Sequence, residues 1–533
     1  MLHFVQHDSE WMISEVQTDI SLPHFFNHIT NHNMKLNRLI SLFGLAAVIC
    51  SCCNDPMVVR TTTGKVQGIE EDGTIAFKGI PYAKVERFMP PQKAEPWDTV
   101  MICDKFGPYA MQASMGNFVT EADMSEENTC TINVWTKDTK ADMPVMLWVH
   151  GGGYATGSSA WNPGMGLAKK DVVFVSINHR LNILGYLDLS SFGEKYKYSG
   201  NVGELDIVAA LEWIQDNIAR FGGDPDNVTI MGHSGGGGKV GSVMCMPSAK
   251  GLFHKAIIYS GVIVGSNTTE TSSKLGEAVV AELGIAPEDI DKILEVPYSE
   301  LTAAGRRASA NVQGIARGFA PTMDGEVIVS QPFAPAFADF SMDIPVIIGS
   351  TLNEMGANYY GKEVTLEQAK ALLAPTFGED TDEFIEAYYE AWPDGSLQDM
   401  LSLDRIFRHS STLSCKAINE LGTAPVYNYL FTWKSPVDDY SAHGDELPFF
   451  FNTIEQDKSK VPEVTPECEL LQDIMSDYWV SFAYTGNPNT GDLPVWHSYD
   501  EADEPCMIFN YTVEEREAFD TRLQELIRKH SRR

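Results

Sequence analysis

Short runs of consecutive apolar residues recur along the chain, separated by longer segments in which apolar residues return every three or four positions. Consecutive apolar, β-branched residues predict strands that are covered on both faces. The strands expected on this basis are 145–149, 172–177, 228–231, 256–259, 346–348 and 426–431. Helical periodicity marks residues 207–214 and 467–483. This alternation predicts an α/β fold with a mostly parallel twisted sheet and helices on both of its faces.

One large domain is expected over residues 53–533, because no repeat, low-complexity segment or linker interrupts the pattern. The length of 533 residues alone would favour several domains, but large α/β enzymes reach such sizes as one unit. Residues 267–317 are rich in helix formers, and we expect them to form a helical excursion above the sheet.

The segment 34–52 has the pattern of an export signal. Two basic residues precede the apolar stretch 39–49, which is too short to span a bilayer. The stretch runs into Ile49-Cys50-Ser51-Cys52, which resembles the lipobox of bacterial lipoproteins and makes Cys52 the candidate for acylation; a signal cleaved without lipidation is the alternative. We expect an exported protein, periplasmic or anchored to the outer membrane, with residues 1–33 an upstream extension outside the fold.

Charge and composition narrow the classes of partner. Hydrophobic residues make up 44% of the chain and charged residues 21%, which is an ordinary globular balance. The formal net charge is -34, and so negative a protein repels nucleic-acid phosphates. Solubility is one interpretation of this charge, and attraction of cationic substrates is another. We expect no nucleic-acid partner, and membrane contact only through the lipid anchor.

The cysteines do not indicate a metal site. Three of the nine are close together at Cys50, Cys52 and Cys53, and no CxxC pair or Cys/His cluster with zinc spacing occurs. The other six are Cys103, Cys130, Cys245, Cys415, Cys468 and Cys506. We expect scattered buried thiols, with one or two disulfides as the alternative.

The segment Gly232-His233-Ser234-Gly235-Gly236 directly follows the expected strand 228–231 and opens a glycine-rich stretch. It is the pattern G-x-S-x-G in the setting of strand, sharp turn and helix, which exposes a serine hydroxyl at the carboxyl edge of a sheet. Gly232 and Gly236 allow strand and helix to approach where a Cβ would clash. The bare pattern is weakly specific, because glycine-rich turns are common. It makes Ser234 the candidate nucleophile.

A second glycine-rich segment, His150-Gly151-Gly152-Gly153-Tyr154, follows the expected strand 145–149. Successive glycines let backbone N–H groups point into a cavity without obstruction by side chains, as an oxyanion hole requires. A flexible loop is the alternative. The position after a buried strand, upstream of Ser234, favours the oxyanion hole.

A serine hydroxyl needs a base to become nucleophilic. Enzymes with this turn carry an acidic residue and then a histidine after the serine. Among the later histidines, His443 lies in a polar loop after the strand 426–431, whereas His497 has the setting of a packed surface residue. Glu354 follows the strand 346–348, where its carboxylate can fix the tautomer of the imidazole. Ser234, His443 and Glu354 are therefore the expected triad.

At these residues the chain resembles the type-B carboxylesterase family, which includes bacterial esterases and cholinesterases. The likeness runs from about residue 58 to about residue 510 and is highly specific in combination. The segments that carry it are Phe77–Ala83, Ile132–Trp135, Asn178–Leu181, Phe221–Val228, Ile348–Gly356, His443-Gly444 and Phe482–Pro488.

This resemblance implies a single α/β-hydrolase domain with a gorge above Ser234. It implies an oxyanion hole built from the backbone N–H groups of Gly152, Gly153 and Gly235. It also implies two-step hydrolysis of a small-molecule carboxylic ester through an acyl-enzyme, without metal or organic cofactor.

The chain departs from the family pattern at several positions. His233 stands where the family usually has Glu before the nucleophile, either as a neutral spacer or as a modulator of the pH optimum. Gly235 replaces the usual Ala and keeps the N–H group. Ala110 and Thr129 occupy the positions of the family's early disulfide, so that bridge is not expected. The loop 111–127 contains no Trp, the residue on which cholinesterases bind quaternary ammonium, which argues against cholinesterase activity.

Two other functions compete with ester hydrolysis. One is a non-catalytic adhesion or binding protein of the same fold, although such family members typically lack a triad residue. The other is cleavage of amides, carbamates or acetylated carbohydrates, which would use the same nucleophile. The sequence predicts neither the ester preferred nor the oligomeric state.

Overall fold

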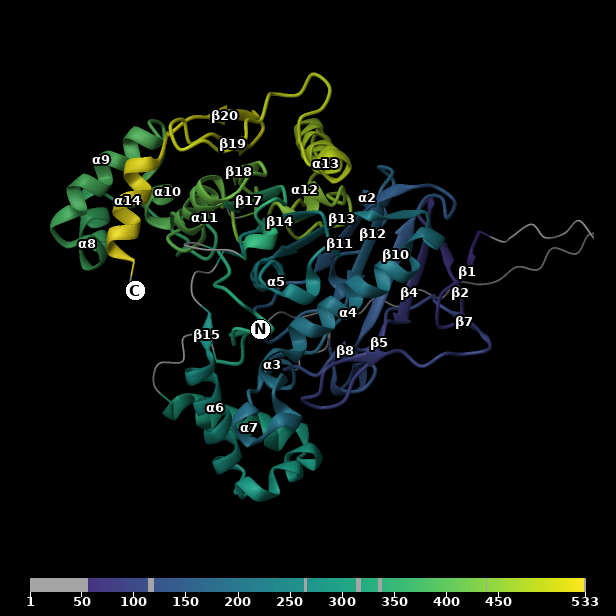
Figure 1. Ribbon diagram of the computed structural model, residues 1–533. Coiled ribbons are helices and arrows are strands. Elements are labelled where there is room, and N and C mark those ends of the chain that lie inside the picture. Colours follow the sequence, from purple (N-terminus) through teal and green to yellow (C-terminus); the bar gives the residue numbers. More distant parts are fainter. Residues whose placement is uncertain are drawn as a thin grey trace, which may run out of the picture. The chain divides into compact units, whose positions relative to one another are not determined.

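The described part of the chain is built around an 11-stranded sheet with the strand order β20-β19-β18-β17-β14-β13-β11-β12-β10-β4-β3 (Figure 1). The computed structural model describes residues 56–113, 119–262, 266–312, 318–333, 338–437 and 439–531. Residues Pro56–Arg533 form one compact unit. The expected export signal 34–52, with Cys52, lies outside the described residues.

The seven central strands, from β12 to β19, are parallel, and antiparallel strands flank them at both edges. The mostly parallel sheet predicted from the apolar runs is thus confirmed. The strands are β3 (Ile69–Glu71), β4 (Thr74–Pro81), β10 (Thr131–Thr136), β11 (Met143–Val149), β12 (Val173–Ile177), β13 (Gly223–His233), β14 (Lys255–Tyr259), β17 (Val346–Thr351), β18 (Val426–Phe431), β19 (Cys506–Phe509) and β20 (Glu514–Arg516).

Smaller strands form separate sheets around the large one. A three-stranded sheet has the order β1-β2-β7, and two-stranded sheets pair β5 with β6, β8 with β9 and β15 with β16. These strands are β1 (Val58–Arg60), β2 (Lys65–Gln67), β5 (Ala83–Lys84), β6 (Gln92–Lys93), β7 (Val100–Ile102), β8 (Tyr109–Ala110), β9 (Met124–Ser125), β15 (Asn267–Thr268) and β16 (Thr322–Met323).

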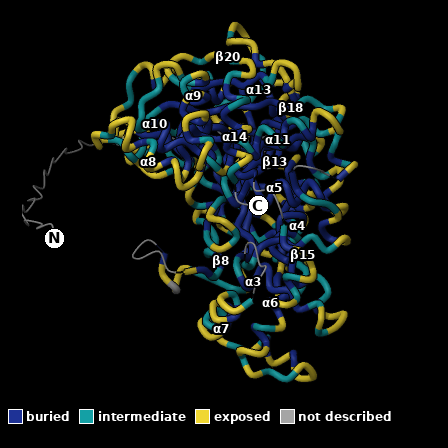
Figure 2. Tube along the Cα trace, turned by 90° about the vertical axis from the view of Figure 1, so that its left-hand side faces the viewer, coloured by how far each residue is buried: buried dark blue, intermediate teal, exposed yellow. Residues whose placement is uncertain are grey.

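Helices cover both faces of the large sheet, so alternate residues of each central strand enter two different cores. One face packs against α4 (Val202–Asn217), α5 (Gly235–Val243) and α11 (Phe407–Leu421). The opposite face packs against α2 (Met165–Ala168), α12 (Leu447–Phe450) and α13 (Pro466–Thr485). Figure 2 shows the buried positions in the interior and the exposed positions mainly at the periphery. The helices expected at 207–214 and 467–483 are α4 and α13.

Two groups of helices form satellite cores away from the sheet faces (Figure 1). The first group contains α3 (Asn182–Tyr186), α6 (Thr269–Glu282) and α7 (Tyr298–Asn311), together with the 3₁₀ helix Pro287–Glu295. The described part, 267–312, of the excursion expected at 267–317 belongs to this group. The second group contains α8 (Leu366–Phe377), α9 (Thr381–Ala391), α10 (Leu397–Ser402) and α14 (Thr521–His530).

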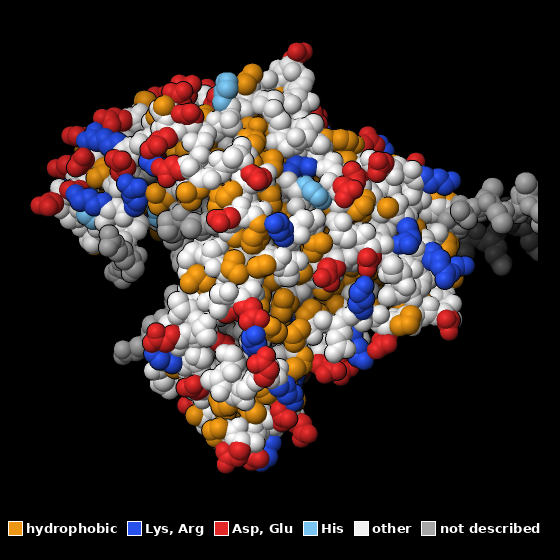
Figure 3. Space-filling model, in the orientation of Figure 1, with side chains coloured by type: hydrophobic (Ala, Val, Ile, Leu, Met, Phe, Trp, Pro, Cys, Tyr) orange, Lys and Arg blue, Asp and Glu red, His pale blue; other side chains and the backbone are white. Residues whose placement is uncertain are grey.

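The cysteines within the described ranges are free and buried, at the six positions from Cys103 to Cys506 named above. Ala110 and Thr129 are buried as well, and Cys130 beside Thr129 is a free thiol. No helix among the described residues is long and apolar enough to cross a membrane. Acidic side chains are spread over the face seen in Figure 3, with Lys and Arg among them.

Candidate active site

The turn around Ser234 lies between β13, which ends at His233, and α5, which begins at Gly235. Ser234 has φ 57° and ψ -126°, a conformation that a non-glycine residue rarely adopts. Its N–H donates to Tyr259 O at 2.9 Å, and its carbonyl accepts from Gly238 N at 3.0 Å. A Cβ on Gly232 would lie 2.4 Å from the carbonyl carbon of Gly236, so the close approach inferred from the sequence is present.

The glycine loop after β11 lies directly against this turn. A Cβ on Gly151 would be 2.8 Å from His233 O and 3.4 Å from Ser234 Cβ, and one on Gly235 would be 2.1 Å from Gly153 O. Gly152 and Gly153 have φ of 94° and 63°. None of the backbone N–H groups of Gly152, Gly153 and Gly235 donates a hydrogen bond to another described residue. They remain available for an incoming oxygen.

Glu354 and His443 meet through both backbone and side chain. Glu354 lies just past β17 with φ 50° and is 2% exposed. His443 N donates to Glu354 O at 3.2 Å, and a hydrogen bond joins His443 Nδ1 to Glu354 Oε2. The other carboxylate oxygen, Oε1, accepts from Ser260 Oγ at 2.6 Å and from Thr351 N at 2.7 Å. These contacts fix the carboxylate and, through it, the orientation of the imidazole.

Two rings pack against His443. The ring of Phe407 stacks on it with centroids 5.3 Å apart and an interplanar angle of 16°, and the ring of His233 lies at 4.3 Å. Because His233 directly precedes Ser234, this contact brings His443 to the nucleophile turn. The described side chains of Ser234 and His443 form no direct hydrogen bond. Such catalytic contacts are often long before substrate binds.

The pKa of His443 reflects opposing influences. Burial alone would lower it, but the hydrogen bond and the negative charge of Glu354 raise the pKa above its ordinary value. Burial and the charge of Glu354 also raise the pKa of Glu446 to about 8 and that of Asp404 to about 7. Both carboxyls therefore keep their protons to higher pH than an exposed carboxyl does.

His233 is 8% exposed, and its Nε2 has no hydrogen-bond partner among the described residues. Burial, followed by the charges of His443 and Lys460, holds the pKa of His233 well below its usual value. An uncharged ring results at neutral pH, which favours the neutral spacer over a fixed positive charge.

The other histidines after Ser234 lie elsewhere. His497 is exposed and pairs with Glu515, and His530 pairs with Asp380. His254 accepts the N–H of Val228, where β13 and β14 run side by side. Of the three residues expected from chain order, His443 contacts Glu354 directly and approaches Ser234 through the preceding residue, His233.

Sequence reasoning missed Ser260, Glu446 and Phe407. Ser260 follows β14, the strand between the one that leads to Ser234 and the one that leads to Glu354, and its position at a strand end was a usable signal. Glu446, three residues after His443, and Phe407, distant in sequence, carried no such signal.

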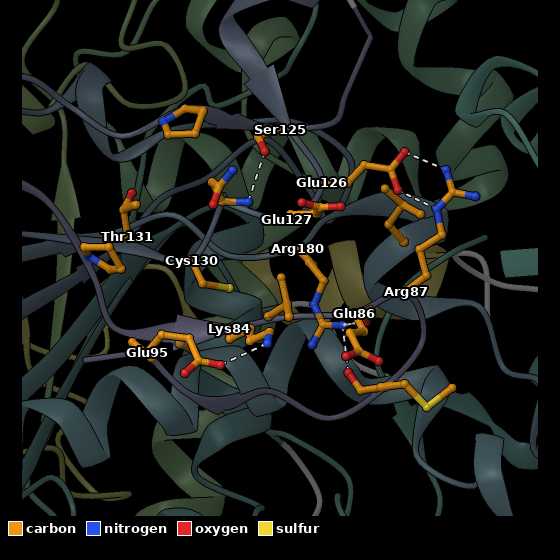
Figure 4. Close-up of a pocket in the computed structure, with 18 of the residues that line it drawn as sticks. Lys84, Glu86, Arg87, Glu95, Ser125, Glu126, Glu127, Cys130, Thr131 and Arg180 are labelled. Carbon is orange, nitrogen blue, oxygen red and sulfur yellow. Dashed lines mark hydrogen bonds and ion pairs between the residues drawn. The ribbon is translucent and has the colours of Figure 1, made fainter. Parts of the chain in front are cut away.

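A cavity of about 1350 Å³ is lined by none of the expected site residues (Figure 4). Four of its charged side chains pair with one another, Arg87 with Glu126 and Lys84 with Glu95. Arg180, from the segment 178–181, lines it while donating to buried Asp206. Within the described ranges, no group of three or more His, Cys, Asp or Glu is placed to hold a metal ion.

Comparisons with known proteins identify the relatives of this chain. The sequence model of the carboxylesterase family matches residues 55–526. The para-nitrobenzyl esterase of Bacillus subtilis is 33% identical over 86% of this chain and 95% of its own length. An esterase from Clostridium hathewayi described as hydrolysing aliphatic aromatic polyesters superposes with a TM-score of 0.80, at 35% identity over 90% of this chain and 99% of its own. A Geobacillus stearothermophilus carboxylesterase superposes with a TM-score of 0.71, at 32% identity over 88% of this chain and 99% of its own.

Proposed function

The chain belongs to the carboxylesterase family and is a carboxylic ester hydrolase of the α/β-hydrolase fold, and on this premise we propose that it works by two-step acyl transfer to Ser234. The observation that carries the proposal is the hydrogen bond between His443 and buried Glu354, with the His443 ring against the residue that precedes Ser234. The expected triad and oxyanion hole thus become the proposed machinery.

In the first step, His443 accepts the Ser234 proton as Oγ attacks the ester carbonyl. Because Nδ1 of His443 is engaged with Glu354, Nε2 is the atom that receives the proton. The imidazolium is stabilised by the Glu354 carboxylate and then protonates the departing alcohol. In the second step, water attacks the acyl-enzyme with His443 again as base, which releases the acid and restores Ser234.

The N–H groups of Gly152, Gly153 and Gly235 receive the negative charge of the tetrahedral intermediate. Each donor contributes on the order of 3 kcal/mol of barrier reduction in acyl-transfer enzymes. His233 is proposed as the uncharged support behind His443. The reaction proposed here uses side chains, backbone donors and water.

Covalent labelling tests the nucleophile. A fluorophosphonate should label the intact protein at the peptide that contains Ser234, and Ser234→Ala should lose both the label and nearly all turnover of nitrophenyl esters. Ser242→Ala, on the same helix, is the matched control and should keep both. Failure of the intact protein to react would contradict the proposal and favour a non-catalytic binding protein. Labelling of Ser234→Ala at equal yield would also contradict it, because the reactive nucleophile would then be another residue.

The names of the relatives suggest the first substrates to assay. One is called a para-nitrobenzyl esterase and another is described as acting on aliphatic aromatic polyesters. We propose small esters with an aromatic group on either side of the carbonyl. A panel of nitrophenyl esters of increasing acyl length, para-nitrobenzyl esters and acetylated sugars distinguishes this class from carbohydrate deacetylation by the ratio of kcat/KM values.

Export with a lipid anchor on Cys52 is proposed from the sequence of residues 34–52 alone. In a bacterial host, radiolabelled palmitate should enter the full chain and be lost in Cys52→Ala. Cys53→Ala is the matched control and should keep the label. Equal labelling of the two variants, or none in the parent, would contradict acylation at Cys52.

A further inference from the structure

Lys239 is a buried lysine in the helix that begins directly after the proposed nucleophile, Ser234. It lies in α5, five residues after Ser234, and is 0% exposed. Lysine is almost never fully buried without a partner, because removing an ammonium group from water costs several kcal/mol. The proposed mechanism gives Lys239 no part, so its burial needs a separate explanation.

The side chain of Lys239 contacts both ends of the glycine loop. Its Nζ donates to His150 O at 3.3 Å, directly before Gly151. The same Nζ lies 6.0 Å from the centre of the Tyr154 ring, directly after Gly153, within the range of cation–π attraction. One ammonium group thus links the start and the end of the segment that holds two of the proposed oxyanion donors.

Glu204 of α4 is the buried acidic group that interacts electrostatically with Lys239. It is 0% exposed, accepts from Tyr186 OH at 3.4 Å through Oε1, and leaves Oε2 without a partner among the described residues. Burial raises the pKa of Glu204 to about 8, whereas Lys239 acts to lower it. Burial lowers the pKa of Lys239 to about 7, and Glu204 acts against that shift.

The remaining ionisable neighbours do not compete for the ammonium group. His150 and His179 stack with ring centroids 4.9 Å apart, and burial followed by the charge of Lys239 lowers the pKa of both, that of His150 to about 3. Both rings are therefore uncharged near neutral pH. Asp206, on the same helix as Glu204, is paired with Arg180. The His150 carbonyl and the Tyr154 ring remain as the contacts of Nζ.

We infer that Lys239 is a positioning residue for the oxyanion hole, which fixes the loop 150–154 at both ends so that its amides face the carbonyl carried by Ser234. This inference rests on the proposed function and deepens it. Lys239 acts through the loop and does not touch the substrate. A displacement of the donors by about 1 Å costs on the order of a hundredfold in rate.

The test compares Lys239→Met with Lys255→Met. Lys255 is also a buried lysine, 6% exposed, but it lies at the amino end of the central strand β14 and donates to Asn227. With nitrophenyl esters, we expect Lys239→Met to lower kcat about ten- to a hundredfold with little change in KM, and Lys255→Met to leave kcat within about twofold. Equal kcat in the two variants would overturn the inference.

A trifluoromethyl ketone gives a second readout, because addition of the serine hydroxyl to its carbonyl places an oxyanion in the loop. In Lys239→Met its inhibition constant should rise by the same factor by which kcat/KM falls, since the lost interaction is made in the transition state. An unchanged inhibition constant would contradict positioning of the donors.

The double variant Lys239→Met/Glu204→Leu separates positioning from stability. It also removes the buried carboxyl that Lys239→Met leaves without its neighbouring amine, so the double variant should regain thermal stability and still show the lowered kcat. It also serves if the single variant fails to fold. Recovery of kcat together with stability would make Lys239 merely structural. Inactivity of the parent, no faster than Ser234→Ala, would instead refute the proposed function.

Discussion

Replacing Gly235 by alanine introduces the residue that the family usually has, yet the structure predicts that it damages this enzyme. The added Cβ would lie 2.1 Å from the carbonyl oxygen of Gly153 and 2.4 Å from its carbonyl carbon and Cα. These are backbone atoms, so no side chain can rotate away. Gly235 lies in a helix and not at positive φ, which means that the new methyl group meets no intrinsic backbone strain.

The expected result follows from which segment gives way. Helix α5 is held by β13 and β11, since a Cβ on Gly236 would be 2.1 Å from Val149 O, so it has little freedom to move. The loop around Gly153 must retreat by about 1 Å or more. Misplacing an oxyanion donor in this way costs on the order of 10² to 10³ in kcat, or about 3 to 4 kcal/mol of barrier. The free energy of unfolding should change less than the activation barrier. Gly→Ala stabilises by about 0.4–1 kcal/mol through the lower entropy of the unfolded chain, which opposes the overpacking cost of about 1–3 kcal/mol.

Steady-state kinetics with a nitrophenyl ester and thermal unfolding are measured together. Gly241→Ala, on the same helix, is the matched control, because its Cβ would first meet Cζ of Phe333 at 2.4 Å, the far end of a side chain outside the loop 150–154. It should retain most of kcat. If Gly235→Ala turns over within about fivefold of the parent, the loop does not lie where the argument places it, and the reasoning fails.

Three further predictions concern the base and the core. Glu354→Gln should lower kcat by up to roughly 10⁴-fold. It should also move the acid limb of kcat/KM to lower pH. The Glu354 carboxylate raises the pKa of His443, and without it the effect of burial, which lowers that pKa, is no longer opposed. His233→Glu should move that limb to higher pH, because a carboxylate against the imidazole stabilises its protonated form, as a pH–rate profile would detect. Asp206→Asn should cost about 3–5 kcal/mol in urea unfolding, because Arg180 is left buried without its partner.

Each of these predictions has a control within the chain. His497 pairs with Glu515 at the surface, so Glu515→Gln should leave the pH–rate profile unchanged. His233→Gln removes the ring without adding charge and should move the acid limb of kcat/KM less than His233→Glu does. An unchanged acid limb in His233→Glu would show that position 233 does not tune the base. Asp216 pairs with exposed Lys93, so Asp216→Asn should cost less than about 0.5 kcal/mol. A loss from Asp206→Asn no larger than this would refute the account of Arg180.

The sequence predicted the central strands because each crosses the molecule with both faces covered, which requires consecutive apolar residues such as those of β12 and β17. It did not reveal β10 so directly, because Asn133 in that strand is fully buried and donates to Ser176 O. A polar residue whose hydrogen bonds lie inside the core has the same one-dimensional pattern as a surface residue. The edge strands β3 and β20 are short and partly exposed, so they have little periodicity to detect.

The candidate site was predictable where function depends on strand ends. Ser234, Glu354 and His443 could be chosen because each follows an apolar run at the carboxyl edge of a parallel sheet. The groups that surround them come from segments without that regularity. Lys239 lies in a glycine-rich helix whose sequence has too few apolar residues to show which face is buried. The burial of Lys239 depends on how the loop 150–154 folds over it.

The backbone at the site shows why these positions resist prediction from local preference. The adjacent strands β13, β14 and β17 lead to Ser234, Ser260 and Glu354, which have φ of 57°, 45° and 50°. Each such conformation costs about 1–3 kcal/mol for a non-glycine residue, so local preferences oppose all three. They persist because each is held across the sheet: Ser234 N by Tyr259 O, Ser260 N by Gly349 O, and Glu354 Oε1 by Ser260 Oγ. The strained turn of each strand end is thus stabilised by its neighbour, and the orientation of the carboxylate and the hydroxyl becomes a property of the sheet as a whole.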